Sequence, residues 1–179
     1  DFPDEAIVHA LLGLAYGRID DAGRAIDELK RAVELAPDDG KNHLYLAQLY
    51  EGHQRGKIAE EHYLKALEKN PVLDEAWLKL GDLAMERQDL VTARQDFAVA
   101  AHLSPDNGEA RARLAAIYQQ DGNWPAAARE LQAMLDRDPE NLEFSLRLGV
   151  LHLDHFLKAK GPDERDAAAT QARKYLSKV

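Results

Sequence analysis

The sequence contains no cysteine, which excludes disulfide bonds, thiolate zinc sites and cysteine nucleophiles. Its apolar runs are short, and none approaches the roughly 20 residues that a membrane-spanning helix requires. Proline is scarce, at seven residues in 179, and the frequent alanine, leucine, glutamate and arginine favour helices. Basic residues are outnumbered, because 23 Lys and Arg stand against 32 Asp and Glu and leave a net charge of −9. This acidic balance disfavours nucleic acid and anionic membranes as partners.

The remaining composition is that of a folded, water-soluble chain. Hydrophobic residues make up 45% and charged residues 31% of the sequence, and 179 residues predict one domain or one array. The first ten residues contain neither an initiator methionine nor a basic segment, so we expect no targeting signal there. Direct insertion into a membrane is not expected, and the sequence leaves the cytoplasm and the periplasm open as compartments.

An internal repeat of 34 residues runs through the chain. Prolines recur at this step at Pro37, Pro71, Pro105 and Pro139. Leucines keep the same step, each followed by glycine or alanine, at Leu12, Leu46, Leu80, Leu114 and Leu148. A third column consists of Ala25, Ala59, Ala93 and Ala127, each with a large side chain four residues later. Three independent columns in step identify a repeat protein.

These columns resemble the tetratricopeptide repeat signature, W-x2-L-G-x2-Y followed by A-x3-F and P. The third copy resembles it most, with Trp77, Leu80, Gly81, Ala93, Phe97 and Pro105. It departs at Ala84, where the signature has tyrosine, and the other copies carry His9, His43 or Arg111 in place of tryptophan. The resemblance implies an all-α, right-handed solenoid of stacked antiparallel helix pairs. It also implies a protein–protein interaction scaffold that is not an enzyme.

The residue pattern predicts two helices in each repeat. Trp77, Leu80 and Ala84 fall at positions i, i+3 and i+7 of one helical stripe, and each pair completes its core by stacking on the next. We expect one solenoid over residues 1–179, with repeats at 6–39, 40–73, 74–107 and 108–141 and a modified fifth pair at 142–179. The expected helices span 5–18, 21–36, 40–53, 57–69, 74–87, 90–103, 108–121, 124–137, 142–160 and 163 to the end, so the first helix of the fifth pair is the longest. Asp74 and Asn141 are predicted N-caps.

The resemblance also implies a concave groove, lined by a stripe of the first helices that is turned by about 100° from the packing stripe. The predicted partner-binding residues on this stripe are Leu44, Gln48, Glu51, Leu78, Asp82, Met85, Ala112, Ala116, Gln119, Leu146, Val150 and Leu153. One column of the stripe, from Ala10 to Leu146, is entirely apolar, and acidic residues outnumber basic ones around it. We therefore predict a protein or peptide partner that is apolar or amphipathic and has basic flanks. The alternative is that the apolar column only covers the edge of the core.

Some members of the family hold the C-terminal carboxylate of a chaperone with a clamp of Lys, Asn and Arg. The equivalent positions here are Ala10, Leu14, Leu44, Lys41 and Leu78. No carboxylate clamp is therefore expected.

Catalytic and metal-binding patterns are missing from the sequence. It contains no HExxH, no phosphate-binding glycine loop and no nucleophile elbow. His152 and His155 have the spacing of two metal ligands on one helix, but His152 occupies a column that holds tyrosine in three other copies and is interpreted as a packed aromatic. We predict no catalytic residue, no metal site and no cofactor. Two alternatives to a free-standing scaffold stay open: an arm of a larger enzyme or assembly complex, and a unit that self-associates through its apolar column.

Overall fold

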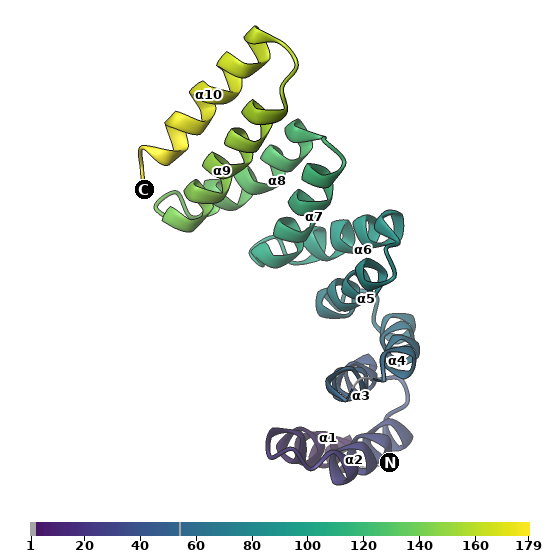
Figure 1. Ribbon diagram of the computed structural model, residues 1–179. Coiled ribbons are helices and arrows are strands. Elements are labelled where there is room, and N and C mark those ends of the chain that lie inside the picture. Colours follow the sequence, from purple (N-terminus) through teal and green to yellow (C-terminus); the bar gives the residue numbers. More distant parts are fainter. Residues whose placement is uncertain (1–2, 54) are drawn as a thin grey trace. The chain divides into compact units, whose positions relative to one another are not determined.

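The computed structural model describes residues 3–53 and 55–179, and within them the chain forms ten helices and no strand (Figure 1). The helices are α1 Pro3–Arg18, α2 Ala22–Leu35, α3 Gly40–Gly52, α4 Gly56–Lys69, α5 Asp74–Glu86, α6 Leu90–Leu103, α7 Gly108–Gln120, α8 Trp124–Arg137, α9 Leu142–Lys158 and α10 Pro162–Leu176. The predicted bounds differ from these by three residues at most, so the all-α prediction is confirmed. None of the described helices is long and apolar enough to cross a membrane.

The chain divides into two compact units, Asp1–Leu103 and Ser104–Val179. Unit 1 contains α1 to α6, and unit 2 contains α7 to α10. Inside each unit, consecutive helices form antiparallel pairs, and the second helix of one pair contacts the first helix of the next (Figure 1). This is the predicted stacking of helix pairs. One uninterrupted array over residues 1–179, with the repeat bounds given above, remains a prediction.

Helix capping follows the 34-residue period and explains one departure from the predicted caps. The side chain of Asn141 accepts a hydrogen bond from the Phe144 N–H at 3.1 Å, which confirms Asn141 as the N-cap of α9. Asp74, by contrast, is the first residue of α5, and the cap position falls on Leu73. Leu73 occupies the column filled by Asp39, Asn107 and Asn141, but its apolar side chain cannot accept a hydrogen bond from the backbone.

Small residues allow close contact between the two helices of a pair. A Cβ atom placed on Gly81 of α5 would lie 2.5 Å from Cε1 of Phe97 in α6. The corresponding contact in the fifth pair brings Gly149 of α9 against Leu176 of α10, where an added Cβ would lie 2.5 Å from Cδ2. The absence of a side chain at these two positions therefore sets how closely the helices approach.

The fifth pair differs from the others as predicted. Its first helix, α9, has 17 residues, whereas α7 of the preceding pair has 13. The next helix begins at Pro162, and the Arg165 Nε–H donates to the Ala159 carbonyl at 3.1 Å across the short connection. Ala168, Ala172 and Tyr175 form the buried side of α10, which is the stripe expected from the sequence.

Candidate protein-binding surfaces

A hollow of about 380 Å³ lies between α7 and α9 in unit 2. Five of the predicted groove residues line it, namely Ala112, Ala116, Gln119, Leu146 and Val150. Ala115, Leu131 and Leu151, which are buried in the core, complete its apolar lining. In this unit the structure therefore brings the predicted stripe together around one concave surface.

Apolar side chains on α9 remain open to solvent beside this hollow. Leu146 is 42% exposed and Val150 is 50% exposed, although both are large and apolar. They lie four residues apart on one face of α9, and Leu153, also exposed, extends this face by a further turn. Across the hollow, α7 presents only the methyl groups of Ala112 and Ala116. These small side chains leave space above the α9 face that a partner side chain could fill.

Charged pairs border the apolar surface. Arg113 Nη2 lies 3.3 Å from Glu109 Oε1 on α7, and Arg147 Nη2 lies 2.6 Å from Glu143 Oε1 on α9. These four residues, together with Phe144, line an adjoining hollow of about 610 Å³. Both pairs are exposed and join residues four apart on a helix, so each contributes less than about 1 kcal/mol to stability.

The opposite end of the hollow carries a third acidic group with partners in the chain. The Gln119 side chain donates to Asp154 at 2.9 Å, and the Lys158 ammonium also donates to it at 3.2 Å. The hydrogen bond from Gln119, with a smaller contribution from Lys158, lowers the pKa of Asp154. Acids around this surface are thus partly balanced by neighbouring donors, which the net charge of the sequence does not reveal.

In unit 1 the predicted apolar column is mostly buried. Leu44 is 4% exposed and belongs to the core formed by α2 to α5, and Leu78 is 6% exposed. These two leucines therefore present little surface, which agrees with the alternative that the column covers the edge of the core. Their assignment to a partner-binding surface stays a prediction.

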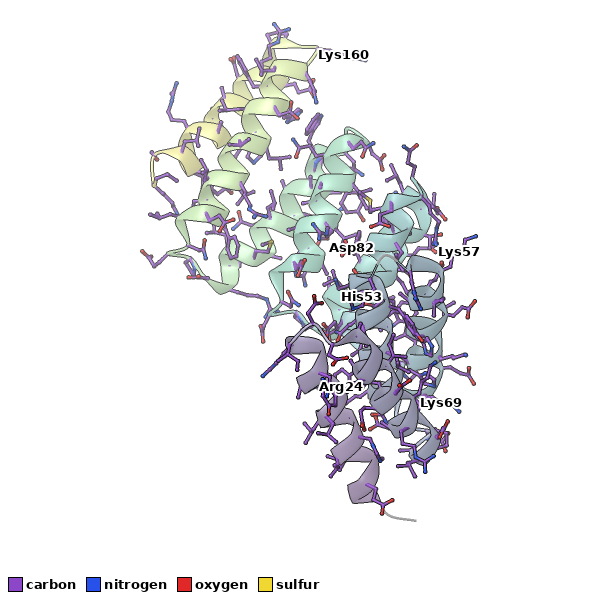
Figure 2. All side chains as sticks on the ribbon, turned by 60° about the horizontal axis from the view of Figure 1, so that its bottom comes forward. Arg24, His53, Lys57, Lys69, Asp82 and Lys160 are labelled. Atoms are coloured by element: carbon purple, nitrogen blue, oxygen red, sulfur yellow. The ribbon has the colours of Figure 1, made fainter. Side chains whose placement is uncertain are left out.

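The polar residues of the predicted stripe in unit 1 bind one another. The Gln48 side chain donates to Glu75 at 2.6 Å, and the Lys79 ammonium donates to Glu51 at 3.1 Å. A shallow hollow of about 420 Å³ is lined by these four residues and Gly52. The Tyr63 hydroxyl also donates to Glu51, and burial together with this carboxylate raises the pKa of Tyr63. Predicted residues Asp82, labelled in Figure 2, and Met85 are both half-buried on α5.

Unit 1 contains a second, mainly apolar hollow of about 310 Å³ between α1 and α3. Ala10 and Leu14 lie in it, as the stripe of the first helices predicts. Leu11 and Tyr45 also line it and were not predicted. Each of these two residues lies one position beyond a stripe residue, so an analysis of the neighbouring helical face would have found them.

The histidines at the end of α9 serve different neighbours. The ring of His152 stacks on Tyr175, with ring centres 5.7 Å apart, which supports its interpretation as a packed aromatic. His155 stacks on Trp124 at 5.4 Å and lies 2.8 Å from a carboxylate oxygen of Glu164. Among residues 3–53 and 55–179, no group of three or more His, Asp or Glu side chains could hold a metal ion. The surface of these residues therefore presents contacts for binding rather than groups arranged for chemistry.

Comparison with known sequences identifies the same repeat. Two sequence profiles described as Tetratricopeptide repeat match this chain, one at residues 10–71 and 44–108 and the other at residues 84–141. A tetratricopeptide repeat-containing protein, trd-1 of Caenorhabditis elegans, is 26% identical over 140 residues. That match covers 78% of this chain and 17% of trd-1, so the chain spans about a sixth of the length of this relative.

Solved structures confirm the fold. A crystal structure of MamA has a TM-score of 0.75 and 18% identity, covering 98% of this chain and 92% of MamA. YrrB, described as a TPR protein with an unusual peptide-binding site, has a TM-score of 0.70 and 17% identity, covering 96% of this chain and 87% of YrrB. The first TPR of Spaghetti, bound to an HSP90 peptide, has a TM-score of 0.61 and 24% identity, covering 66% of this chain and 94% of that domain.

The fold is a protein–protein interaction scaffold, and proteins built from it are generally non-catalytic. The 34-residue columns, the antiparallel helix pairs and the profile matches, which together extend over residues 10–141, agree with one another. This chain belongs to the tetratricopeptide repeat family.

Proposed function

We propose that unit 2 binds an apolar or amphipathic segment of another protein in the hollow between α7 and α9. The observation that carries this proposal is the exposed face of Leu146, Val150 and Leu153 beside the hollow. Large apolar side chains on a helix normally face the core, whereas these three face solvent across two turns of α9. A partner helix or extended peptide whose apolar side chains enter the space above Ala112 and Ala116 would cover them.

The expected affinity is modest. Complete burial of one leucine or valine side chain stabilises a complex by about 1.5–3 kcal/mol, and the three groove residues are already about half buried. Association itself costs at least about 4 kcal/mol in lost translational and rotational freedom. A dissociation constant in the micromolar range follows, and a partner with several copies of the segment would bind more tightly.

Basic flanks on the partner belong to the same proposal. Glu109 and Glu143 on the border of the hollow are paired with arginines but remain more than half exposed, so each carboxylate can accept a further cation. The net charge of −9 adds a long-range attraction for basic segments. A carboxylate clamp is not part of the proposal, because the corresponding positions are occupied by Ala10, Leu14, Leu44, Lys41 and Leu78.

Selection from a displayed library of helical and linear peptides would test this function. Peptides selected on the wild-type chain should be amphipathic, and Val150→Glu should weaken their binding by about tenfold or more, because one apolar contact is replaced by a charge. Leu157→Glu provides the matched control, since Leu157 lies on the same helix, is more exposed than Val150 and lies outside the hollow. Equal binding by wild type and Val150→Glu would disprove the proposed site.

A second candidate function is that of an arm in a larger protein. The cellulose synthase operon protein C of Pseudomonas fluorescens is 32% identical over 111 residues, which cover 62% of this chain and only 9% of that protein. Such a repeat region could position a catalytic or assembly domain for its partners. Co-purification of the partner peptide with a larger polypeptide that contains residues 1–179 would support this role, and binding by the isolated chain alone would favour the first.

A further inference from the structure

Helix α1 (Pro3–Arg18) carries more apolar surface than its neighbours cover. Ile7, Val8, Leu11 and Leu12 are all large and apolar, and each is 40–60% exposed. A surface helix of a folded domain normally confines such residues to the side that faces the core, and a helix that is apolar on every side is normally buried. The structure of α1 therefore indicates a face that another element covers.

The repeat identifies this face as the one on which helix pairs stack. The residues 34 and 68 positions after Leu12 are Leu46 and Leu80, which are 1% and 5% exposed, whereas Leu12 is 40% exposed. Leu46 lies on α3 and Leu80 on α5, and the second helix of the preceding pair packs on each of these helices. Within residues 3–53 and 55–179, α1 is the first helix and has no preceding pair of this kind.

The spacing of residues on this face is that of a helix–helix seam. Glu5, Val8, Leu12, Ala15 and Ile19 follow one another at alternating intervals of three and four, and all five are exposed. This alternation is the pattern by which two helices pack along their length. The occupant that fits the seam is therefore a helix with a matching apolar stripe.

A second copy of the chain provides such a helix through its own α1. The other terminal helix, α10, does not, because its exposed residues include Asp163, Glu164, Arg165 and Asp166, which would set charges against the seam. Head-to-tail pairing of copies is thus disfavoured, whereas a twofold axis places the apolar seam against itself. We infer that α1 forms a homodimer interface in which the α1 helices of two copies pack antiparallel.

The sequence of α1 also favours one register for this interface. When the twofold axis passes between Leu11 and Leu12, Glu5 of one copy lies opposite Arg18 of the other, which joins opposite charges. The same register places Val8 opposite Ala15, so that a large side chain meets a small one. Two helices of this length bury an area at the lower end of that found for specific interfaces, about 1,200 Å² in total, so we expect a micromolar dissociation constant.

Sedimentation velocity of the 179-residue chain between about 1 and 200 µM tests this inference. The expected result is a monomer–dimer equilibrium in wild type and a monomer throughout this range for Val8→Glu. The matched control is Leu64→Glu, which introduces the same charge at an exposed residue of α4 and should dimerise as wild type does. A wild-type chain that stays monomeric, or a dimer that Val8→Glu leaves unchanged, would overturn the inference.

A charge exchange tests the register separately. Glu5→Arg and Arg18→Glu should each weaken the dimer, and the double variant should restore it, because opposite charges then face each other again. Failure of the double variant to restore the dimer would overturn the antiparallel register. Val150→Glu, which tests the hollow of unit 2, should leave this dimer unchanged, so the two proposals can fail independently.

Discussion

The imidazole Nδ1 of His9 lies 2.5 Å from Glu28 Oε2, and these two residues are 19 positions apart. The same interval joins His43 to His62 at 3.0 Å in the second repeat and Arg111 to Glu130 at 2.9 Å in the fourth. Each of these pairs connects the first helix of a repeat to its second, at the column where the repeat signature has tryptophan. A polar contact between the helices thus replaces the tryptophan in three of the repeats.

The third repeat keeps the tryptophan, and this changes the environment of Asp96. Trp77 donates its Nε1–H to the Pro71 carbonyl at 2.9 Å, so it offers no charge to Asp96, which lies 19 positions after it. Burial without a cation at this position raises the pKa of Asp96 to about 6. Arg24, labelled in Figure 2, illustrates the opposite case on the surface, because its contact with Asp21 lowers the pKa of that carboxyl.

Asp96→Asn should therefore stabilise the chain at pH 7. The folded state holds the Asp96 proton up to about pH 6, whereas the unfolded chain releases it near pH 3.8, so the wild type loses stability as the pH rises through this window. Removal of the charge should raise the free energy of unfolding by about 1–2 kcal/mol at pH 7 and change it little at pH 3.5. Urea unfolding at both pH values measures this, with Asp27→Asn on the exposed face of α2 as control. A destabilised Asp96→Asn at pH 7 would contradict the assignment.

The His43–His62 contact should make stability depend on pH with the opposite sign. Burial, assisted by His43 and nearby lysines, lowers the pKa of His62 from 6.5 to about 4, and burial also lowers that of His43. The unfolded chain then binds protons more readily between pH 6.5 and 4, so stability is lost as the pH falls through this window. We expect His62→Gln to remove about 1–3 kcal/mol of this dependence. The comparison is best made in the Asp96→Asn background, and an unchanged slope there would rule out His62 as the source.

The difference between the two ends of the groove column leads to a further prediction. Leu78→Glu should reduce the free energy of unfolding by about 2–4 kcal/mol, because it places a carboxylate where the side chain is 6% exposed. Leu146→Glu should change it by less than about 0.5 kcal/mol, because this side chain is 42% exposed. Thermal unfolding of the two variants measures the difference. Equal melting temperatures would show that the column has the same environment at both positions.

These leucines also show how far the sequence predicts the molecule. The 34-residue columns predict which side of each helix packs, since every repeat places the same residue types on the same side. They do not predict how deeply a side chain is buried, because that depends on the size of the residues around it. Leu146 stays open where α7 contributes only Ala112 and Ala116, and Leu78 in the same column is covered. The polar contacts 19 residues apart could have been predicted from the columns, because both members keep the 34-residue step.

Gly81→Ala should be among the most destabilising single-methyl changes in unit 1. The added Cβ would lie 2.5 Å from Cε1 of Phe97, whose ring is fully buried and therefore cannot move aside without disturbing the core. A loss of about 1–3 kcal/mol in the free energy of unfolding is expected from this overpacking, even though alanine favours helices more than glycine does. Gly52→Ala is the matched control, because Gly52 ends α3 and an added Cβ meets nothing within 4 Å. The control should be neutral or stabilised by up to about 1 kcal/mol. Should Gly81→Ala behave like the control, the close contact between α5 and α6 would not be the feature that requires a small residue in this column.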